Sequence, residues 1–108
     1  EHTQALRVRR YLSQTGWEDA NLAQAAQAMH MTPHTLLRRL EADGTSFQAI
    51  KDALRRDIAI RHLQTGGQSV EAIAADLGFS SAASFHKAFH RWTGNTPSSY
   101  RRNRPAIA

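Results

Sequence analysis

The stretch SFQAIKDALRRDIAIRHLQT, residues 46–65, predicts one long helix around which the rest of the chain is organised. Ser46 is the expected N-cap, and the glycines at 66–67 end the helix, because glycine has low helix propensity and accepts a left-handed cap. Apolar side chains three to five residues apart form one stripe that we expect to be buried: Phe47, Ile50, Leu54, Ile58 and Leu63.

The segments before and after this helix are predicted to be two copies of one helical pair. Asn21 and Thr32 are the expected N-caps of the first copy, and Ser69 and Ser80 are those of the second. Pro33 follows Thr32 at the first helical position, where a missing N–H costs nothing. The expected helices cover residues 22–29, 33–43, 70–77 and 81–93. Two degenerate copies joined by a rod are the simplest explanation of this similarity.

A tight turn joins the two helices of each copy. Equivalent residues are 48 apart before the turn and 49 apart after it, so the second copy carries one additional residue there. Such a turn needs a residue with positive φ, which Gly78 supplies in the second copy. His30 takes this place in the first copy, and histidine visits the left-handed region more often than most residues. Each copy is therefore predicted to be a helix-turn-helix, whose second helix can enter a DNA major groove about 12 Å wide.

Composition favours a small, basic, all-α protein. The 108 residues carry 14 Lys and Arg against 9 Asp and Glu, for a net charge of +5, which suits a polyanionic partner. No apolar run approaches the ~20 residues of a membrane span, and the absence of cysteine excludes disulfides and thiolate metal sites. We expect a cytoplasmic protein with no cofactor, no metal and no membrane contact. Because the chain starts at Glu1 rather than Met, we also expect a fragment that is missing an N-terminal domain.

Two shorter helices complete the predicted architecture. A helix over residues 4–14 covers the first copy, and Thr96 with Pro97 starts a short last helix that Tyr100 anchors. The predicted organisation is a first helix-turn-helix subdomain at 1–45, a linker helix at 46–66, a second subdomain at 67–102 and a tail at 103–108.

The segments HMTPHTLLRRLEADGTSF (30–47) and SVEAIAADLGFSSAASFHKAFHRWTGNTPSSYRR (69–102) resemble the DNA-binding domain of AraC/XylS-type bacterial transcription regulators. The resemblance covers about residues 6–102. It implies seven helices and two helix-turn-helix subdomains, 21–44 and 69–94, docked in successive major grooves of one DNA face. The linker helix, roughly 28 Å long at 1.5 Å per residue, is comparable to the ~34 Å between such grooves. In this family a separate domain binds an effector or dimerises, and many members recruit RNA polymerase, as a bacterial activator does.

Helical phase selects the side chains of the first copy that can read bases. Leu36 and Leu40 are expected to point inward, which leaves five residues nearer the outward face: His34, Thr35, Leu37, Arg38 and Glu41. The first four of these are the base-reading candidates. Arg38 can fork onto guanine O6 and N7, whereas Leu37 is either a plain surface leucine or a contact to a thymine methyl. The resemblance places the main base-reading positions on His34, Leu37 and Arg38, where Leu37 departs from the polar residue often found in the family.

In the second copy Phe85 and Phe89 are expected to point inward, so the outward candidates are Ala82, Ala83, Ser84, His86 and Lys87. The alanines offer only methyl contacts, so we expect weak base reading combined with phosphate contacts. Helix starts attract phosphate through their free N–H groups and dipole, and basic side chains do so by charge. The remaining phosphate candidates are Thr32, Arg39, Lys51, Ser80, Ser81, Arg91 and Arg101.

Two other functions are weighed against DNA binding. An enzyme would have to use the pairs His30/His34 and His86/His90, which have the four-residue spacing of helical metal ligands. Neither pair carries the Glu that HExxH places after the first His, and no nucleophile motif or phosphate loop is visible. A basic helical adaptor would bind protein or membrane surfaces and show no sequence-selective DNA retention. The sequence favours a non-enzymatic, double-stranded-DNA-binding domain over both.

Overall fold

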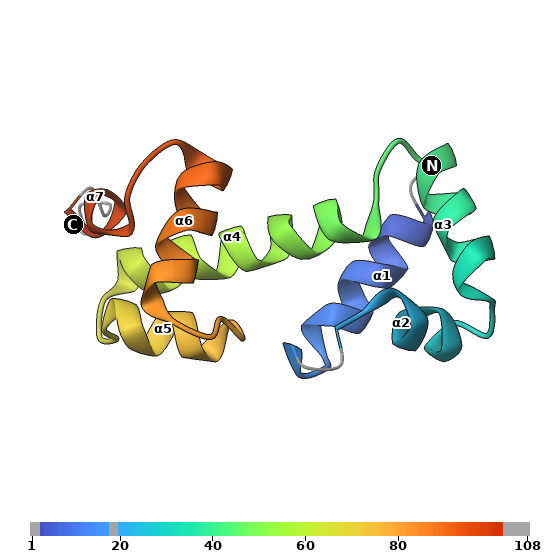
Figure 1. Cartoon of the computed structure of the whole chain (residues 1–108), viewed down its shortest axis with the longest axis horizontal. Helices are drawn as coiled ribbons and strands as arrows, with labels where there is room; N and C mark the ends of the chain where they lie inside the picture. Colours follow the sequence, from blue (N-terminus) through green and yellow to red (C-terminus); the bar gives the residue numbers. More distant parts are fainter. Residues whose placement is uncertain (1–2, 18–19, 103–108) are drawn as a thin grey trace. The chain divides into compact units, whose positions relative to one another are not determined.

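The computed structural model describes residues 3–17 and 20–102, and within them the secondary structure consists of helices without a strand. The helices in these ranges are α1 (Thr3–Ser13), α2 (Leu22–Ala28), α3 (Pro33–Ala42), α4 (Phe47–Thr65), α5 (Val70–Asp76), α6 (Ala82–Thr93) and α7 (Pro97–Arg102) (Figure 1). The all-α, seven-helix prediction is confirmed. The predicted tail at 103–108 lies outside the described residues.

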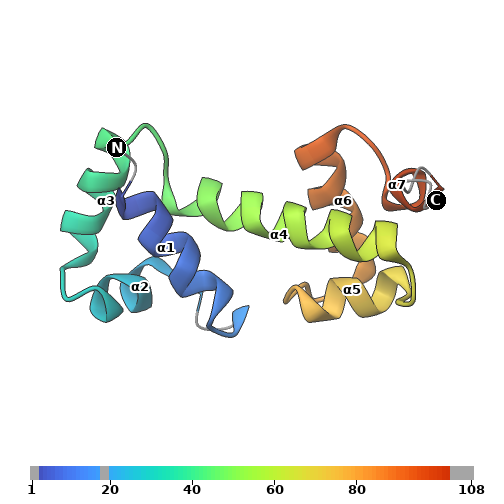
Figure 2. The ribbon, with the colours of Figure 1, turned by 180° about the vertical axis from the view of Figure 1, so that it is seen from behind.

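The chain divides into two compact units, Glu1–Leu54 and Arg55–Ala108, so the boundary falls inside α4. In the first unit α1, α2 and α3 gather around the beginning of α4, and in the second α5, α6 and α7 gather around its end (Figures 1 and 2). The long helix is therefore shared: each of its halves completes the core of one unit.

The first unit has an aliphatic core. The small side chains of Ala25 and Ala26 are fully buried on α2, which allows α2 and α3 to pack closely. Lys51 on α4 donates a hydrogen bond of 3.1 Å from its ammonium to the carbonyl of Ala20, across 31 residues of sequence. This bond ties Ala20, just before the cap of α2, to α4. The larger fully buried side chains of this unit are Val8, Leu12, Leu36 and Leu40.

The second unit has an aromatic core built on α6. The Phe85 and Phe89 rings are fully buried, with their centroids 5.7 Å apart. Phe79, from the turn before α6, lies 5.5 Å from Phe85 and carries the Arg55 guanidinium 4.4 Å above its ring. Tyr100 meets Phe89 edge-on at 5.1 Å, which anchors α7 as predicted. Each of these fully buried phenylalanines is worth about 1.5–3 kcal/mol of burial free energy.

The predicted stripe on the linker helix needs one correction. Phe47, Ile50, Leu54 and Leu63 are buried, but Ile58 is only half-buried and Ala59 is the fully buried residue beside it. A single stripe assumes one buried face along the whole helix. Because the two halves of α4 complete different units, the buried positions do not follow one continuous repeat.

The predicted helix caps are confirmed with one exception. Asn21, Thr32, Ser46, Ser69 and Thr96 each accept the backbone N–H three residues ahead, at 2.9–3.1 Å. In α6, however, Ser81 rather than Ser80 is the N-cap, and the helix starts one residue later than predicted. Two adjacent serines offer the same hydroxyl, so local sequence could not decide between them.

Candidate nucleic-acid interface

Both helical pairs contain the same turn, built from the same hydrogen bonds. In the first unit His30 N–H bonds to the Gln27 carbonyl and Met31 N–H to the Ala26 carbonyl, at 3.1 and 3.0 Å. In the second unit the residues 48 positions later, from Ala74 to Phe79, repeat both bonds at 3.0 Å. This pattern closes a helix through a left-handed residue.

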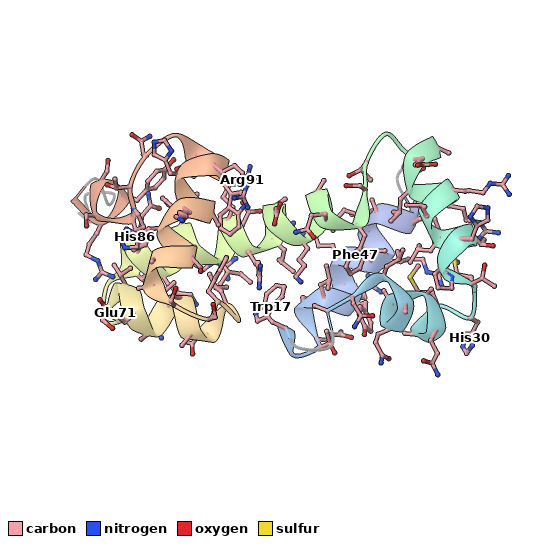
Figure 3. The ribbon with its side chains drawn as sticks, viewed as in Figure 1. Trp17, His30, Phe47, Glu71, His86 and Arg91 are labelled. Atoms are coloured by element: carbon pink, nitrogen blue, oxygen red, sulfur yellow. The ribbon has the colours of Figure 1, made fainter. Side chains whose placement is uncertain are left out.

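The left-handed residue of each turn is the one predicted. His30 has a φ of 59° and Gly78 a φ of 83°, and His30 is the one non-glycine residue with positive φ in the part of the chain that the structure describes. Figure 3 shows His30 at the turn between α2 and α3. The additional residue of the second copy lies just after this position. Two residues separate Gly78 from the Ser81 cap, whereas one separates His30 from the Thr32 cap.

The two second helices, α3 and α6, also start alike. Thr32 accepts the N–H of Thr35 and donates its own hydroxyl to the Thr35 hydroxyl at 2.9 Å. Ser81 makes the same two bonds to Ser84, with a hydroxyl to hydroxyl distance of 3.1 Å. The second hydroxyl of each pair keeps its proton as a donor for another partner. Sequence reasoning did not foresee this pairing, although the repeated hydroxyl residues at spacing three could have indicated it.

On α3 the outward candidates are solvent-accessible. His34, Leu37 and Arg38 are exposed, and Thr35 is half-buried. Leu36 and Leu40 are both fully buried, so the predicted helical phase is confirmed. A hollow of about 330 Å³ follows this helix and is lined by Thr35, Arg38, Arg39 and Ala42. Two guanidinium groups therefore border a surface hollow on the helix expected to enter DNA.

On α6 the outward face is polar and basic toward its C-terminal end. Ala83, Ser84, His86 and Lys87 are exposed, and Ala82 is half-buried. Arg91, which Figure 3 labels on α6, is exposed and follows Lys87 by four residues, about one helical turn. Because both phenylalanines are fully buried on the opposite side, this orientation of α6 is held by its core.

Two of the predicted phosphate contacts are engaged inside the units. The Lys51 ammonium is bonded to the Ala20 carbonyl, and the Arg101 guanidinium is bonded to the Gln68 carbonyl. Both bonds are part-buried, and the second ties α7 to the turn before α5. Phosphate contacts by these two residues stay predictions that require the present bonds to be broken or shared. The other predicted contacts, Thr32, Arg39, Ser80, Ser81 and Arg91, are exposed.

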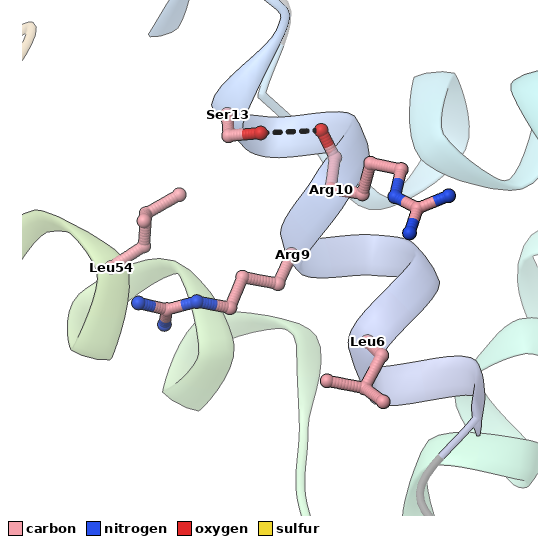
Figure 4. A pocket seen from close by; sticks show the side chains of 5 residues that line it. All are labelled: Leu6, Arg9, Arg10, Ser13 and Leu54. Carbon is pink, nitrogen blue, oxygen red and sulfur yellow. Dashed lines mark hydrogen bonds between the residues drawn. The ribbon is translucent and has the colours of Figure 1, made fainter.

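The surface has a further hollow, which lies in the first unit. It measures about 350 Å³ and is lined by Leu6, Arg9, Arg10, Ser13 and Leu54 (Figure 4). Figure 4 shows one hydrogen bond between these residues, which the Ser13 hydroxyl donates to the Arg10 carbonyl at 2.8 Å. Among these described lining residues there is no carboxylate and no histidine.

Within the described ranges, no three side chains of His, Asp or Glu come together as metal ligands. In the same part of the chain no helix is long and apolar enough to cross a membrane. Of the histidine pairs weighed as metal ligands, His30 lies in a turn and His34 in the helix after it, whereas His86 and His90 lie about one turn apart on α6 and are both exposed.

Comparison with known proteins identifies the family. A family model described as "Helix-turn-helix domain" matches residues 25–103, which is most of the chain. The chain belongs to the AraC/XylS-type helix-turn-helix family. This match begins inside α2 and spans both turns described above, so it covers the second copy and all but the start of the first.

Relatives of this AraC/XylS-type domain are transcription regulators rather than enzymes. The ornithine utilization regulator of Pseudomonas aeruginosa is 38% identical over 95 residues, which cover 88% of this chain and 28% of the regulator. The crystal structure of the transcriptional regulator CdpR from the same species is 32% identical, with a TM-score of 0.83, over 92% of this chain and 31% of that one.

A further solved structure supports the fold alone. A DNA-binding transcriptional dual regulator from Escherichia coli K-12 has a TM-score of 0.86 at 24% identity, over 92% of this chain and 89% of that one.

Among curated relatives, the chain spans less than a third of the length of the ornithine utilization regulator. The AraC/XylS-type domain is thus a DNA-binding module of the kind found in larger bacterial regulators.

Proposed function

We propose that this domain binds a specific double-stranded DNA sequence by placing α3 and α6 in successive major grooves. The observation that carries the proposal is the repetition of one turn, with the same hydrogen bonds and the same left-handed residue, before two helices that each bury one face and expose a polar one. A major groove about 12 Å wide admits a single helix, and the net charge of +5 suits the phosphate backbone.

The first unit contributes most of the base reading in this proposal. Arg38 donates two hydrogen bonds to guanine O6 and N7, and His34 and Thr35 reach neighbouring base edges or phosphates. The second unit relies on Ser84, His86 and Lys87, because Ala82 and Ala83 carry no hydrogen-bonding group. Specificity therefore comes mainly from α3, and α6 adds affinity and register.

Phosphate contacts fix the register of both helices on the duplex. Thr35 and Ser84 each keep one hydroxyl proton at the start of a helix, where the positive end of the helix dipole favours an anion. The exposed basic residues Arg39 and Arg91 lie farther along the same helices. Each lysine or arginine that neutralises a phosphate releases counterions and makes binding depend on salt.

The complete protein is proposed to be a bacterial transcription regulator that acts in the cytoplasm at the nucleoid. Its remaining chain would hold an effector-binding or dimerisation domain before this one, and RNA polymerase would be its partner at promoters. The alignment of this chain with the ornithine utilization regulator over 95 residues supports the proposal that the complete protein regulates gene expression.

Selection from random duplexes tests the proposal. The chain should enrich one sequence and bind it at least ~10³-fold more tightly than a scrambled duplex of equal length at the same salt concentration. Equal affinity for both duplexes, at any salt, would favour the basic adaptor instead. Salt must be held fixed because non-specific binding is itself strongly salt-dependent.

A further inference from the structure

Leu37 is an apolar side chain on an otherwise polar helix face. Among the large hydrophobic residues that the structure describes, two are exposed, Leu6 at 67% and Leu37 at 37%. Leu36 and Leu40 already fill the core side of α3. The side chains around Leu37 on the outer face, His34, Arg38 and Glu41, are exposed and polar. Leu37 therefore lies where the proposed function places DNA, and outside the core of its unit.

Resting on the proposed function, we infer that Leu37 determines specificity by packing on the C5-methyl of a thymine. In the major groove thymine is the base that presents a methyl group, whereas the other bases present hydrogen-bond donors and acceptors. A leucine cannot satisfy a donor or an acceptor. If it covered the amino group of adenine or cytosine, that group would lose water without gaining a partner. The contact thus favours thymine and disfavours the alternatives.

The neighbouring Arg38 sets where this thymine lies. A guanine and a thymine cannot share one base pair, so the two contacts fall on different pairs. Leu37 and Arg38 are adjacent on α3, about 1.5 Å apart along the helix axis and about 100° apart around it, so both side chains reach the same short stretch of groove. The inferred element of the binding site is a T·A pair close to the G·C pair read by Arg38.

Single-methyl substitution in the DNA tests the inference. Each thymine of the selected duplex is replaced in turn by deoxyuridine, which lacks only the C5-methyl, and the affinity of each duplex is measured. One position should weaken binding about fourfold, the factor expected for one buried methyl-sized group. In the Leu37→Ala chain the same replacement should have almost no effect, because the two changes remove the same contact. That position should lie close to, and not at, the pair at which Arg38→Ala relaxes the base preference.

Two control variants isolate the contact. Leu6→Ala removes the other exposed leucine, which lies on α1, and should leave the deoxyuridine profile of the wild type unchanged. Leu37→Met keeps an apolar side chain of similar volume and should retain the sensitive position. Circular dichroism of each variant verifies that its helices are intact.

The outcomes separate this inference from the proposed function. Selective binding with no deoxyuridine-sensitive position, or with a sensitive position that survives Leu37→Ala, overturns the role of Leu37 and leaves DNA recognition standing. If the sensitivity to deoxyuridine also disappears in the Leu6→Ala chain, the role of Leu37 is overturned as well, because the effect is then not local to α3. Absence of selective binding overturns both.

Discussion

The turn of the second unit should be far less tolerant of substitution than the turn of the first. Gly78 has a φ of 83°, and its N–H and that of Phe79 bond to the end of α5 at 3.0 Å. Alanine in the left-handed region costs about 1–2 kcal/mol, while its lower entropy in the unfolded chain returns about 0.4–1 kcal/mol. We therefore expect Gly78→Ala to destabilise the second unit by about 1 kcal/mol, and Gly78→Val by more because its side chain is β-branched.

The matched change in the first unit is His30→Gly. His30 has a φ of 59°, so glycine removes left-handed strain of about 1–2 kcal/mol but adds a smaller entropic cost of about 0.5–1 kcal/mol in the unfolded chain. The free energy of unfolding should therefore rise by between zero and about 1.5 kcal/mol. Because the two turns have the same geometry, opposite signs of the change in unfolding free energy for Gly78→Ala and His30→Gly would follow from the residue types alone.

The chain holds two tryptophans, one in each unit, which allows each unit to be followed separately. In a Trp17→Phe background, the fluorescence of Trp92 reports on the second unit during urea unfolding. Its ring centroid lies 6.0 Å from that of Phe79, the residue after Gly78. Trp92→Phe leaves Trp17 as the reporter of the first unit. Equal shifts of the midpoint for Gly78→Ala and His30→Gly, or no shift for Gly78→Ala, would refute the turn assignment.

Three further substitutions test the interface and the core. Arg38→Ala should weaken specific binding by ~1–3 kcal/mol and relax the preference at one base pair; equal weakening on random duplexes would make Arg38 a phosphate contact. Lys87→Ala should lower the slope of log affinity against log salt concentration by about one, and an unchanged slope would remove Lys87 from the phosphate contacts. Phe89→Ala should cost about 3–5 kcal/mol of unfolding free energy, measured through Trp92, because it empties a fully buried position; a cost below 1 kcal/mol would contradict that packing.

Much of the fold could be predicted because its signals are local. A cap needs one side-chain oxygen and an N–H three residues ahead, so Asn21, Thr32 and Ser69 could be recognised from their positions alone. The turn needs a residue that accepts positive φ, and glycine at position 78 is a direct sequence signal of such a residue. The repeat then identified His30 as the counterpart of Gly78, although a histidine by itself is only a weak indication of a left-handed turn residue.

Sequence reasoning fell short where distant parts of the chain decide the structure. Lys51 and Arg101 each bond to a carbonyl more than 30 residues away, which helical periodicity cannot reveal, and their predicted phosphate contacts stay predictions. Ile58 was expected in the core because the stripe was extended along the whole linker helix. Ala59 is buried instead, since this half of the helix completes the second unit. The DNA-reading roles on α3 and α6 stay predictions that rest on exposure and phase.

Hydroxyl-radical footprinting on the selected duplex tests most directly whether both helical pairs bind DNA. The wild-type chain should protect two segments whose centres are about 10 base pairs apart, one helical turn of DNA. Inserting five base pairs between the segments should leave only one of them protected and lower the affinity, because the two grooves then face opposite sides of the duplex. A single protected segment on the selected duplex, or full affinity after the insertion, would contradict recognition by both copies.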